Sequence, residues 1–275
     1  MALSLETRVS LNDGTKMPVL GLGVWQAAPG KETRTAVAAA LEIGYRLIDT
    51  AKLYGNERDV GIAVRESGIR RDEIFVTTKL WNSDHGYESA LRAFERSRKE
   101  LGLDIVDLYL VHWPVPGLRH ESWKALLRLR DDGLARSVGV SNYTARHLKE
   151  LVPASPTQPS VNQVEFHPFL YQKELLSYCE SHGVQLEAYS PLMKGHRHDD
   201  PVLLGIAAKY NRTVAQILIR WSLQHGLVVI PKSVRAERIR ENASVFDFEL
   251  RREDMERLDA LDERSHTAWN PDDLP

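Results

Sequence analysis

The chain has 275 residues, of which 43% are hydrophobic and 27% are charged, and its formal net charge at pH 7 is −2. This composition is typical of a globular protein with a sizeable core, and the near-neutral balance argues against a nucleic acid or an anionic membrane as partner. No apolar run approaches the ~20 residues of a membrane span. Cys179 is the only cysteine, so no intramolecular disulfide can form, which fits a reducing compartment.

The first twenty residues predict a β-hairpin rather than a targeting segment. Residues 1–8 lack both a basic stretch and a sustained apolar stretch, so we expect no secretory signal and a cytoplasmic protein. Asn12-Asp13-Gly14 separates two short extended segments, 8–11 and 17–20. These three residue types adopt positive φ at low cost, which is typical of a hairpin turn.

Short apolar runs then alternate with longer segments of helical periodicity. The eight candidate strands are 19–23, 47–49, 74–79, 106–112, 137–141, 161–165, 185–189 and 227–232. Apolar spacing predicts helices between them, for example at 33–42, 89–101, 122–129, 173–181 and 214–224, and several of these end at a glycine. The long interval before the last strand leaves room for an extra helix at 202–210.

Strand followed by helix, repeated eight times, predicts parallel strands inside a layer of helices. We therefore predict an α/β fold, a (β/α)8 TIM barrel with an N-terminal β-hairpin and extra helices before and after the last βα unit. An open, doubly wound sheet is the competing arrangement. No linker, low-complexity tract or recurring repeat divides the chain, so residues 1–275 are predicted to form a single domain.

A polar side chain stands at or near the carboxyl end of each strand from the second to the eighth. In a barrel these ends converge on one face, where active sites lie. A single polar strand end means little, but seven in succession predict a functional site. They are Asp49, Lys79, His112, Ser141 with Asn142, Gln163, Tyr189 and Lys232.

Short motifs, taken in order along the chain, resemble the aldo-keto reductase family. They are GYRLIDTA (44–51), YGNE (54–57), TTKLW (77–81), VHWP (111–114), GVSN (139–142), NQVE (162–165), AYSPL (188–192) and IPKS (230–233). The ordered set spans about Gly21 to Asn242 and is highly specific. The resemblance implies an NADPH-dependent, monomeric oxidoreductase that reduces aldehydes and ketones to alcohols. The short prokaryotic members, which include 2,5-diketo-gluconate, glyoxal and aldehyde reductases, are the most similar in outline.

Carbonyl reduction requires a hydride for carbon and a proton for oxygen. A tyrosine, with a pKa of about 10, is protonated at pH 7 but is a weak donor, and a nearby ammonium group lowers that pKa. We assign Tyr54 as the general acid, Lys79 as the neighbouring cation and Asp49 as the carboxylate that orients Lys79. The resemblance implies the same catalytic set, completed by His112, which hydrogen-bonds the substrate oxygen.

The resemblance also implies a cofactor site at the strand ends, where amides hold the nicotinamide carboxamide and Tyr189 stacks on the ring. Asn142 has a second possible role as N-cap of a helix that begins near Thr144. The residues implied to contact this half of the cofactor are Ser141, Asn142, Gln163, Tyr189, Ser190 and Leu192.

A basic cluster that we expect to open the last helix favours NADPH over NADH. Lys232, Ser233 and Val234, with Arg238 four residues further on, could hold a 2′-phosphate, because helix N-termini and cations bind phosphate. In the family, the positions of Glu241 and Asn242 approach the adenine. The alternative for the cluster is a solvated basic helix face.

Three tryptophans, each just after a strand end, are candidates for an apolar substrate wall beside His112, although single tryptophans more often pack in the core. They are Trp25, Trp81 and Trp113. Substrate specificity is also expected in the C-terminal tail. Because the tail after Leu261 is short and polar, we expect an open pocket that admits sugar-derived ketones, glyoxals and simple aldehydes.

Two other motifs carry no predicted function. Gly21-Leu22-Gly23 resembles the start of a dinucleotide-binding fingerprint, but Gln26 replaces the third glycine and no helix follows. Residues 196–200 (HRHDD) offer four metal-ligating side chains, yet such close spacing on a loop rarely forms a closed site, so no metal is expected.

Two other functions compete with the reductase. A barrel lyase could use Lys79 as a Schiff-base nucleophile, which requires a lowered lysine pKa. A sensor or regulatory subunit could bind NADPH with little turnover.

Overall fold

The structure, a computed structural model, describes residues 3–151 and 157–274. Eight parallel strands pair in chain order: β3 (Leu22–Gly23), β4 (Leu47–Asp49), β5 (Phe75–Leu80), β6 (Val106–Val111), β7 (Ala135–Ser141), β8 (Val161–Glu165), β9 (Gln185–Tyr189) and β10 (Val228–Val229). Bridges from Leu20 to Val229 and from Gly23 to Lys232 join the last strand to the first. The sheet therefore closes into the predicted (β/α)8 barrel, and the open doubly wound sheet is wrong.

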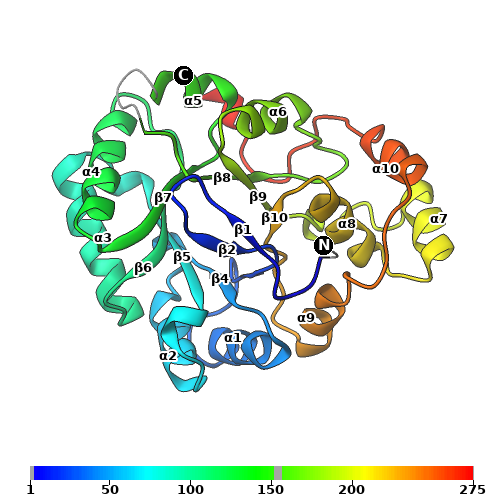
Figure 1. Ribbon diagram of the computed structural model, residues 1–275, viewed down its shortest axis with the longest axis horizontal. Helices are drawn as coiled ribbons and strands as arrows, with labels where there is room; N and C mark the ends of the chain where they lie inside the picture. Colours follow the sequence, from blue (N-terminus) through cyan, green and yellow to red (C-terminus); the bar gives the residue numbers. More distant parts are fainter. Residues whose placement is uncertain (1–2, 152–156, 275) are drawn as a thin grey trace.

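Helices surround the barrel (Figure 1). One follows each strand in turn: α1 (Lys31–Ile43), α2 (Glu57–Glu66), α3 (Tyr87–Leu101), α4 (Arg119–Asp131), α5 (Ala145–Leu151), α6 (Lys173–Ser181), α8 (Val214–Gln224) and α9 (Ala236–Ala243). The predicted extra helices are α7 (Pro201–Tyr210), before α8, and α10 (Arg252–Asp259), after α9. Among the described residues, no helix is long and apolar enough to cross a membrane.

The predicted hairpin closes the amino-terminal end of the barrel. β1 (Arg8–Ser10) and β2 (Lys16–Pro18) pair antiparallel around a turn in which Gly14 has a φ of +87°. Leu11 and Met17 pack with the first inward-facing side chains of several strands, among them Leu47 and Phe75. Figure 1 shows the hairpin across the middle of the ring of helices. The opposite, carboxyl end of the barrel is therefore the open one.

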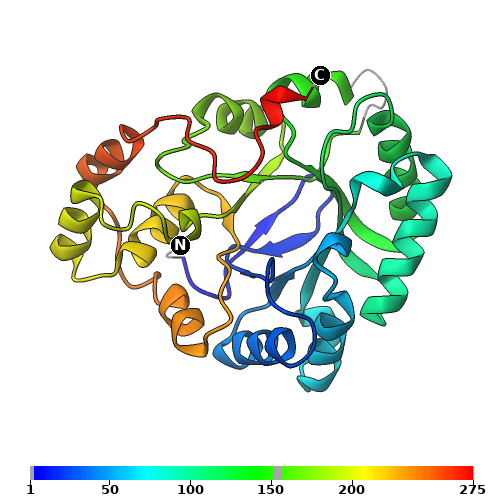
Figure 2. The same cartoon turned by 180° about the vertical axis from the view of Figure 1, so that it is seen from behind.

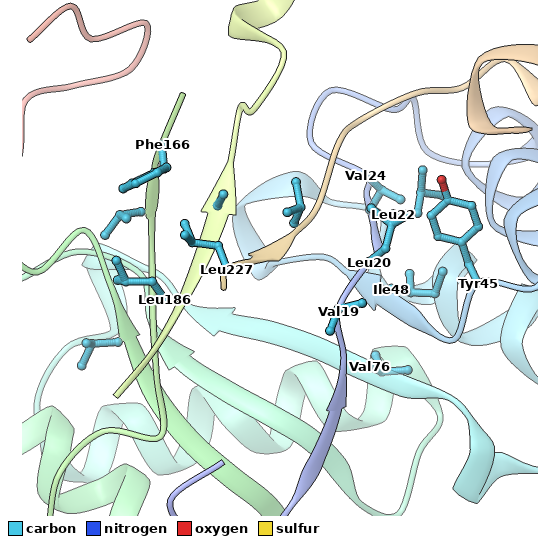
Figure 3. Packing of buried hydrophobic residues seen from close by; sticks show 14 of the residues in the cluster. Val19, Leu20, Leu22, Val24, Tyr45, Ile48, Val76, Phe166, Leu186 and Leu227 are labelled. Carbon is cyan, nitrogen blue, oxygen red and sulfur yellow. The ribbon is translucent and has the colours of Figure 1, made fainter. Parts of the chain in front are cut away.

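The period of two in a β-strand decides which side chains face the barrel interior. Ile48 and Val76 point outward and pack in the layer between strands and helices, as Figure 3 shows. Leu47 and Phe75, one residue earlier in each strand, point inward and pack in one cluster with Leu11 and Met17. The same alternation turns Asp49 in β4 inward, at the carboxyl end of its strand.

Candidate active site

A buried lysine forms the centre of the polar cluster inside the barrel. The Lys79 side chain, in β5, is 0% exposed, and its Nζ donates to Asp49 Oδ1 at 2.6 Å, to the Thr50 carbonyl at 2.9 Å and to the Tyr54 hydroxyl at 3.2 Å. Tyr54 reaches it from the short 3-10 helix η1 (Lys52–Tyr54) that follows β4. All three ammonium hydrogens therefore have an acceptor.

The charges of this cluster favour an ammonium beside a neutral phenol. Burial lowers the pKa of Lys79, but Asp49 and Tyr54 outweigh it, so the pKa is raised and the lysine stays charged. Burial raises the pKa of Tyr54 to about 12, while the Lys79 charge opposes that rise. Lys79 lowers the pKa of Tyr54 as expected, but desolvation of the phenol exceeds this effect, so the pKa is raised overall. Tyr54 keeps its proton throughout the neutral pH range.

His112 follows β6, and its ring is steeply inclined, by 74°, to the rings of Tyr54 and Trp81, with ring centroids 5.9 and 5.1 Å away. Burial and the Lys79 charge hold the pKa of His112 well below its usual range, so the imidazole is neutral. Its Nδ1 is buried and has no hydrogen-bond partner in the described chain. Because a buried N–H without an acceptor is costly, the single proton belongs on Nε2. His112 can then donate a hydrogen bond toward the cavity that it lines.

A glutamate that the sequence reasoning missed completes the interior network. Gln163 Nε2 donates to Asp49 Oδ2 and to Glu187 Oε2, both at 2.8 Å. Glu187, in the middle of β9, is 0% exposed, and burial together with the Asp49 charge raises its pKa to about 8. Strand alternation could have found it, because Glu187 shares its inward orientation with Tyr189 two residues later.

The amide of Asn142 is held through both its nitrogen and its oxygen at the carboxyl ends of the neighbouring strands. Its Nδ2 donates to the His112 carbonyl at 3.0 Å, and its Oδ1 accepts from the Tyr189 hydroxyl at 2.8 Å. The possible N-cap role of Asn142 is wrong, because Thr144 Oγ1 accepts from the His147 backbone N–H at 3.4 Å instead. Asn142 itself has a φ of 62°, which turns the chain into the loop before α5.

A cavity of about 1220 Å³ opens at the carboxyl end of the barrel and contains nearly every predicted site residue. Lys79 alone lies outside its lining, behind Tyr54. The predicted residues that line it are Trp25, Asp49, Tyr54, Trp81, His112, Trp113, Ser141, Asn142, Gln163, Tyr189, Ser190, Leu192, Lys232, Ser233, Val234, Arg238, Glu241 and Asn242.

One end of this cavity is cationic. Lys232, Arg235 and Arg238 lie there, and none of the three has an ion pair in the described chain. Lys232 to Val234 do not open the helix as expected, because α9 begins at Ala236 with Arg235 as N-cap, whereas Arg238 lies within its first turn. Unpaired cations at a helix N-terminus fit a phosphate group.

The other end is apolar and includes Trp269 from the C-terminal tail, which is not among the predicted site residues. Its ring centroid lies 5.5 Å from that of Trp113 and 6.5 Å from that of Trp81, and the residue is 66% exposed. Figure 2, seen from the opposite side, shows the C-terminal segment passing beside the open end of the barrel. Only the folded tail brings position 269 to a loop that follows β5.

A buried carboxylate anchors this tail. Glu165, at the end of β8, accepts hydrogen bonds from the Thr267 backbone N–H at 2.9 Å and from the Ala268 N–H at 3.0 Å. Although burial raises the pKa of Glu165, hydrogen bonds from His167, His266 and Thr267 outweigh it and lower the pKa. Glu165 thereby fixes the backbone immediately before Trp269.

The histidine- and aspartate-rich loop at 196–200 has structural partners. Asp200 caps α7 by accepting from the Val202 N–H at 2.9 Å, and Arg197 pairs with Glu263 at 2.9 Å. Among the residues described, no group of three His, Cys, Asp or Glu side chains is arranged to hold a metal ion.

Comparisons with known proteins agree with this geometry. The sequence profile of the Aldo/keto reductase family matches residues 19–263. A glyoxal reductase of Bacillus subtilis is 52% identical and aligns over 100% of this chain and 99% of its own length. The methylglyoxal reductase DkgA of Escherichia coli is 45% identical, with 97% of each chain covered. The crystal structure of a point mutant of Gox0644 in complex with NADPH superimposes with a TM-score of 0.92 at 43% identity, over 98% of each chain.

Proposed function

Because this chain belongs to the aldo/keto reductase family and reduces carbonyl compounds with NADPH, we propose that Tyr54 is its general acid and that Lys79, Asp49 and His112 complete the catalytic set. The observation that carries this assignment is the contact of the Lys79 Nζ with both the Tyr54 hydroxyl, at 3.2 Å, and Asp49 Oδ1, at 2.6 Å. In that arrangement a phenol can release its proton beside a fixed positive charge.

Each protein group has one task in the reaction. Tyr54 gives its hydroxyl proton to the carbonyl oxygen, and the Lys79 ammonium stabilises the tyrosinate that remains. Asp49 holds Lys79 charged and in place. His112 donates from Nε2 to the same carbonyl oxygen, so that two hydrogen bonds fix the substrate. NADPH, when bound, supplies the hydride that goes to the carbonyl carbon.

The cavity also fits the cofactor. Its cationic end offers three unpaired positive charges for the phosphates, and Gln163, Asn142 and Ser141 line its centre with amides and a hydroxyl for a carboxamide. Tyr189, beside them, supplies an aromatic face for the nicotinamide ring. Glu241, which would lie near the adenine, is held by the Thr213 hydroxyl at 2.6 Å.

The cationic end predicts how the protein distinguishes NADPH from NADH. Replacement of Arg238 by alanine should raise the dissociation constant of NADPH by about tenfold or more and leave that of NADH within about twofold, because charge-assisted hydrogen bonds contribute about 1.5–3 kcal/mol. Fluorescence titration of the apoprotein with both cofactors measures this. Arg240→Ala, on the same helix but outside the cavity lining, is the matched control. Equal losses for both cofactors would exclude Arg238 as a 2′-phosphate ligand.

We assign small 1,2-dicarbonyl compounds such as glyoxal and methylglyoxal as the substrate class. The two bacterial reductases named above act on such compounds by name. At the Tyr54 end, the described lining is largely aromatic, with Trp81, Trp113 and Trp269 in contact with one another. A small neutral carbonyl compound matches this lining better than a gluconate derivative.

Trp269 predicts a test of this substrate class. Trp269→Ala should lower kcat/KM for methylglyoxal by about tenfold, mainly through KM, and should lower it less for a bulky aldehyde, because removing the ring loses apolar contact and widens the cavity. Steady-state NADPH oxidation with both substrates measures the ratio. Leu204→Ala, which removes a side chain that is 50% exposed on α7 away from the cavity, is the control. If the ratio of kcat/KM for the two aldehydes were unchanged, Trp269 would not contact the substrate.

The two competing functions are not favoured. A Schiff-base lyase needs a lysine with a lowered pKa, whereas the pKa of Lys79 is raised. A sensor without turnover has no need of a proton donor, yet the Tyr54 hydroxyl, its cation and the carboxylate are assembled together. Stopped-flow mixing of the NADPH-bound protein with methylglyoxal distinguishes the sensor, which would leave the bound NADPH unoxidised.

The protein is proposed to act as a cytoplasmic monomer in which residues 1–275 form one domain. Every catalytic and cofactor-site side chain assigned above comes from a single chain, so the site needs no second copy. The lone cysteine, Cys179, is buried in the core and fits a reducing compartment.

A further inference from the structure

Glu187 is a buried carboxyl group in the barrel interior that the catalytic assignment leaves without a role. It lies in β9, whose next inward-facing residue is Tyr189 of the cofactor site. Its Oε2 accepts from Gln163 Nε2 at 2.8 Å, and its Oε1 is buried without a hydrogen-bond partner among the described residues. Asp49, in contrast, receives donors from both Lys79 and Gln163. Glu187 is therefore the less well stabilised of the two carboxyl groups as an anion.

The Gln163 amide connects Glu187 with the catalytic carboxylate. It donates one Nε2 hydrogen to Asp49 Oδ2 and the other to Glu187 Oε2, each at 2.8 Å. The reversed amide would place its oxygen against the Asp49 carboxylate, which is repulsive. Only Oε1 of Gln163 then remains for a ligand in the cavity, and an amide oxygen accepts from N–H groups such as those of the nicotinamide carboxamide.

We propose that Glu187 is a positioning residue: with Asp49 it holds the Gln163 amide so that Oε1 faces the nicotinamide site, and it keeps its proton so that Asp49 remains the only negative charge beside Lys79. This inference rests on the proposed function, because it concerns the same active site. It assigns Glu187 no contact with the substrate.

The groups that face Glu187 determine its behaviour with pH. They are Asp49 from β4, Lys79 from β5, Gln163 from β8 and Tyr54 from η1, while its partner in register on β10 is the apolar Val228. Burial and Asp49 raise the pKa of Glu187 to about 8, against the opposing effects of Gln163 and Lys79. As the pH rises through this value, a second negative charge forms, which raises the pKa of Tyr54 further and makes it a poorer donor. Turnover should therefore fall on the alkaline side.

Two substitutions separate the positioning contact from the charge. Glu187→Gln retains an acceptor for Gln163 but cannot ionise, whereas Glu187→Leu removes the acceptor at similar size. The matched control is Glu57→Gln, because Glu57 is also buried with a raised pKa but accepts from Thr78 Oγ1, at 2.6 Å, on the outer side of the barrel. NADPH affinity of the apoproteins is measured by fluorescence titration, and kcat for methylglyoxal is measured from about pH 6 to 10. Circular dichroism checks the fold of each variant.

At pH 7 we expect Glu187→Gln to bind NADPH within about threefold of the unmodified protein and Glu187→Leu to bind it about tenfold more weakly. The decrease of kcat near pH 8 should persist in Glu57→Gln and disappear in Glu187→Gln. A Glu187→Leu protein that folds and binds NADPH normally would contradict the positioning role. An unchanged decrease of kcat at alkaline pH in Glu187→Gln would contradict the claim that Glu187 keeps its proton at pH 7. Neither result bears on the assignment of Tyr54 as general acid, which the Tyr54→Phe substitution tests separately.

Discussion

Replacement of Tyr54 by phenylalanine should lower kcat for carbonyl reduction at least about 100-fold, the usual scale for loss of a general acid, while NADPH affinity stays within about twofold. The substitution removes one hydroxyl group. Its only hydrogen bond in the described chain is the one from Lys79 Nζ at 3.2 Å. The aromatic ring, which packs 4.8 Å from Trp25, is retained, so the walls of the cavity should not collapse.

Single-turnover mixing of the NADPH-bound protein with methylglyoxal measures this loss directly, because it isolates the chemical step from product release. Tyr87→Phe is the matched control, since Tyr87 is a half-buried tyrosine at the start of α3 outside the cavity lining. If Tyr54→Phe turned over at the rate of Tyr87→Phe, the proton donor would have to be another group, and the assignment would be wrong.

Lys79→Met should have a comparably large effect on turnover, about 100-fold or more, and in addition should destabilise the fold. Without the ammonium, nothing opposes the effect of burial on the Tyr54 phenol, and the tyrosinate formed during reduction loses its counter-charge. The substitution also leaves Asp49 buried with Gln163 as its remaining side-chain donor. Breaking a buried ion pair by removing one partner costs about 3–5 kcal/mol.

The double variant Asp49→Asn/Lys79→Met separates these two effects. It leaves no uncompensated charge in the barrel, so thermal unfolding should show part of the lost stability restored, whereas turnover should stay as low as in Lys79→Met. Recovery of turnover in the double variant would mean that the ion pair serves the fold alone. A Lys79→Met protein with unchanged turnover would exclude the cation from catalysis.

The barrel was predictable because its determinants are local in sequence. Eight short apolar runs, which alternate with segments of helical periodicity that often end at a glycine, are sufficient to specify strand and helix order. The polar residue at each strand end, from Asp49 to Lys232, was equally visible, because parallel strands must bring those ends together. The convergence of nearly all of them on one cavity follows from the closed sheet.

Energetic details were harder to predict, because they depend on the balance of opposing effects in three dimensions. Proximity of Tyr54 to a cation suggests a lowered pKa, yet burial raises it to about 12. Asn142 has the residue type of an N-cap, but the Tyr189 hydroxyl and the His112 carbonyl already occupy its amide. At Tyr54 burial outweighs the nearby cation, and at Asn142 contacts with residues distant in sequence outweigh the local preference.

The order of elements, the barrel and the chemical types of side chain at its open end could be predicted from residue periodicity and from the strand ends. The amide shared by Glu187 and Asp49, and the anchoring by Glu165 of the tail that carries Trp269, became apparent only in the folded chain. Both depend on contacts between distant segments. The charge of a buried group and the lining of a cavity depend on the residues that folding brings beside them.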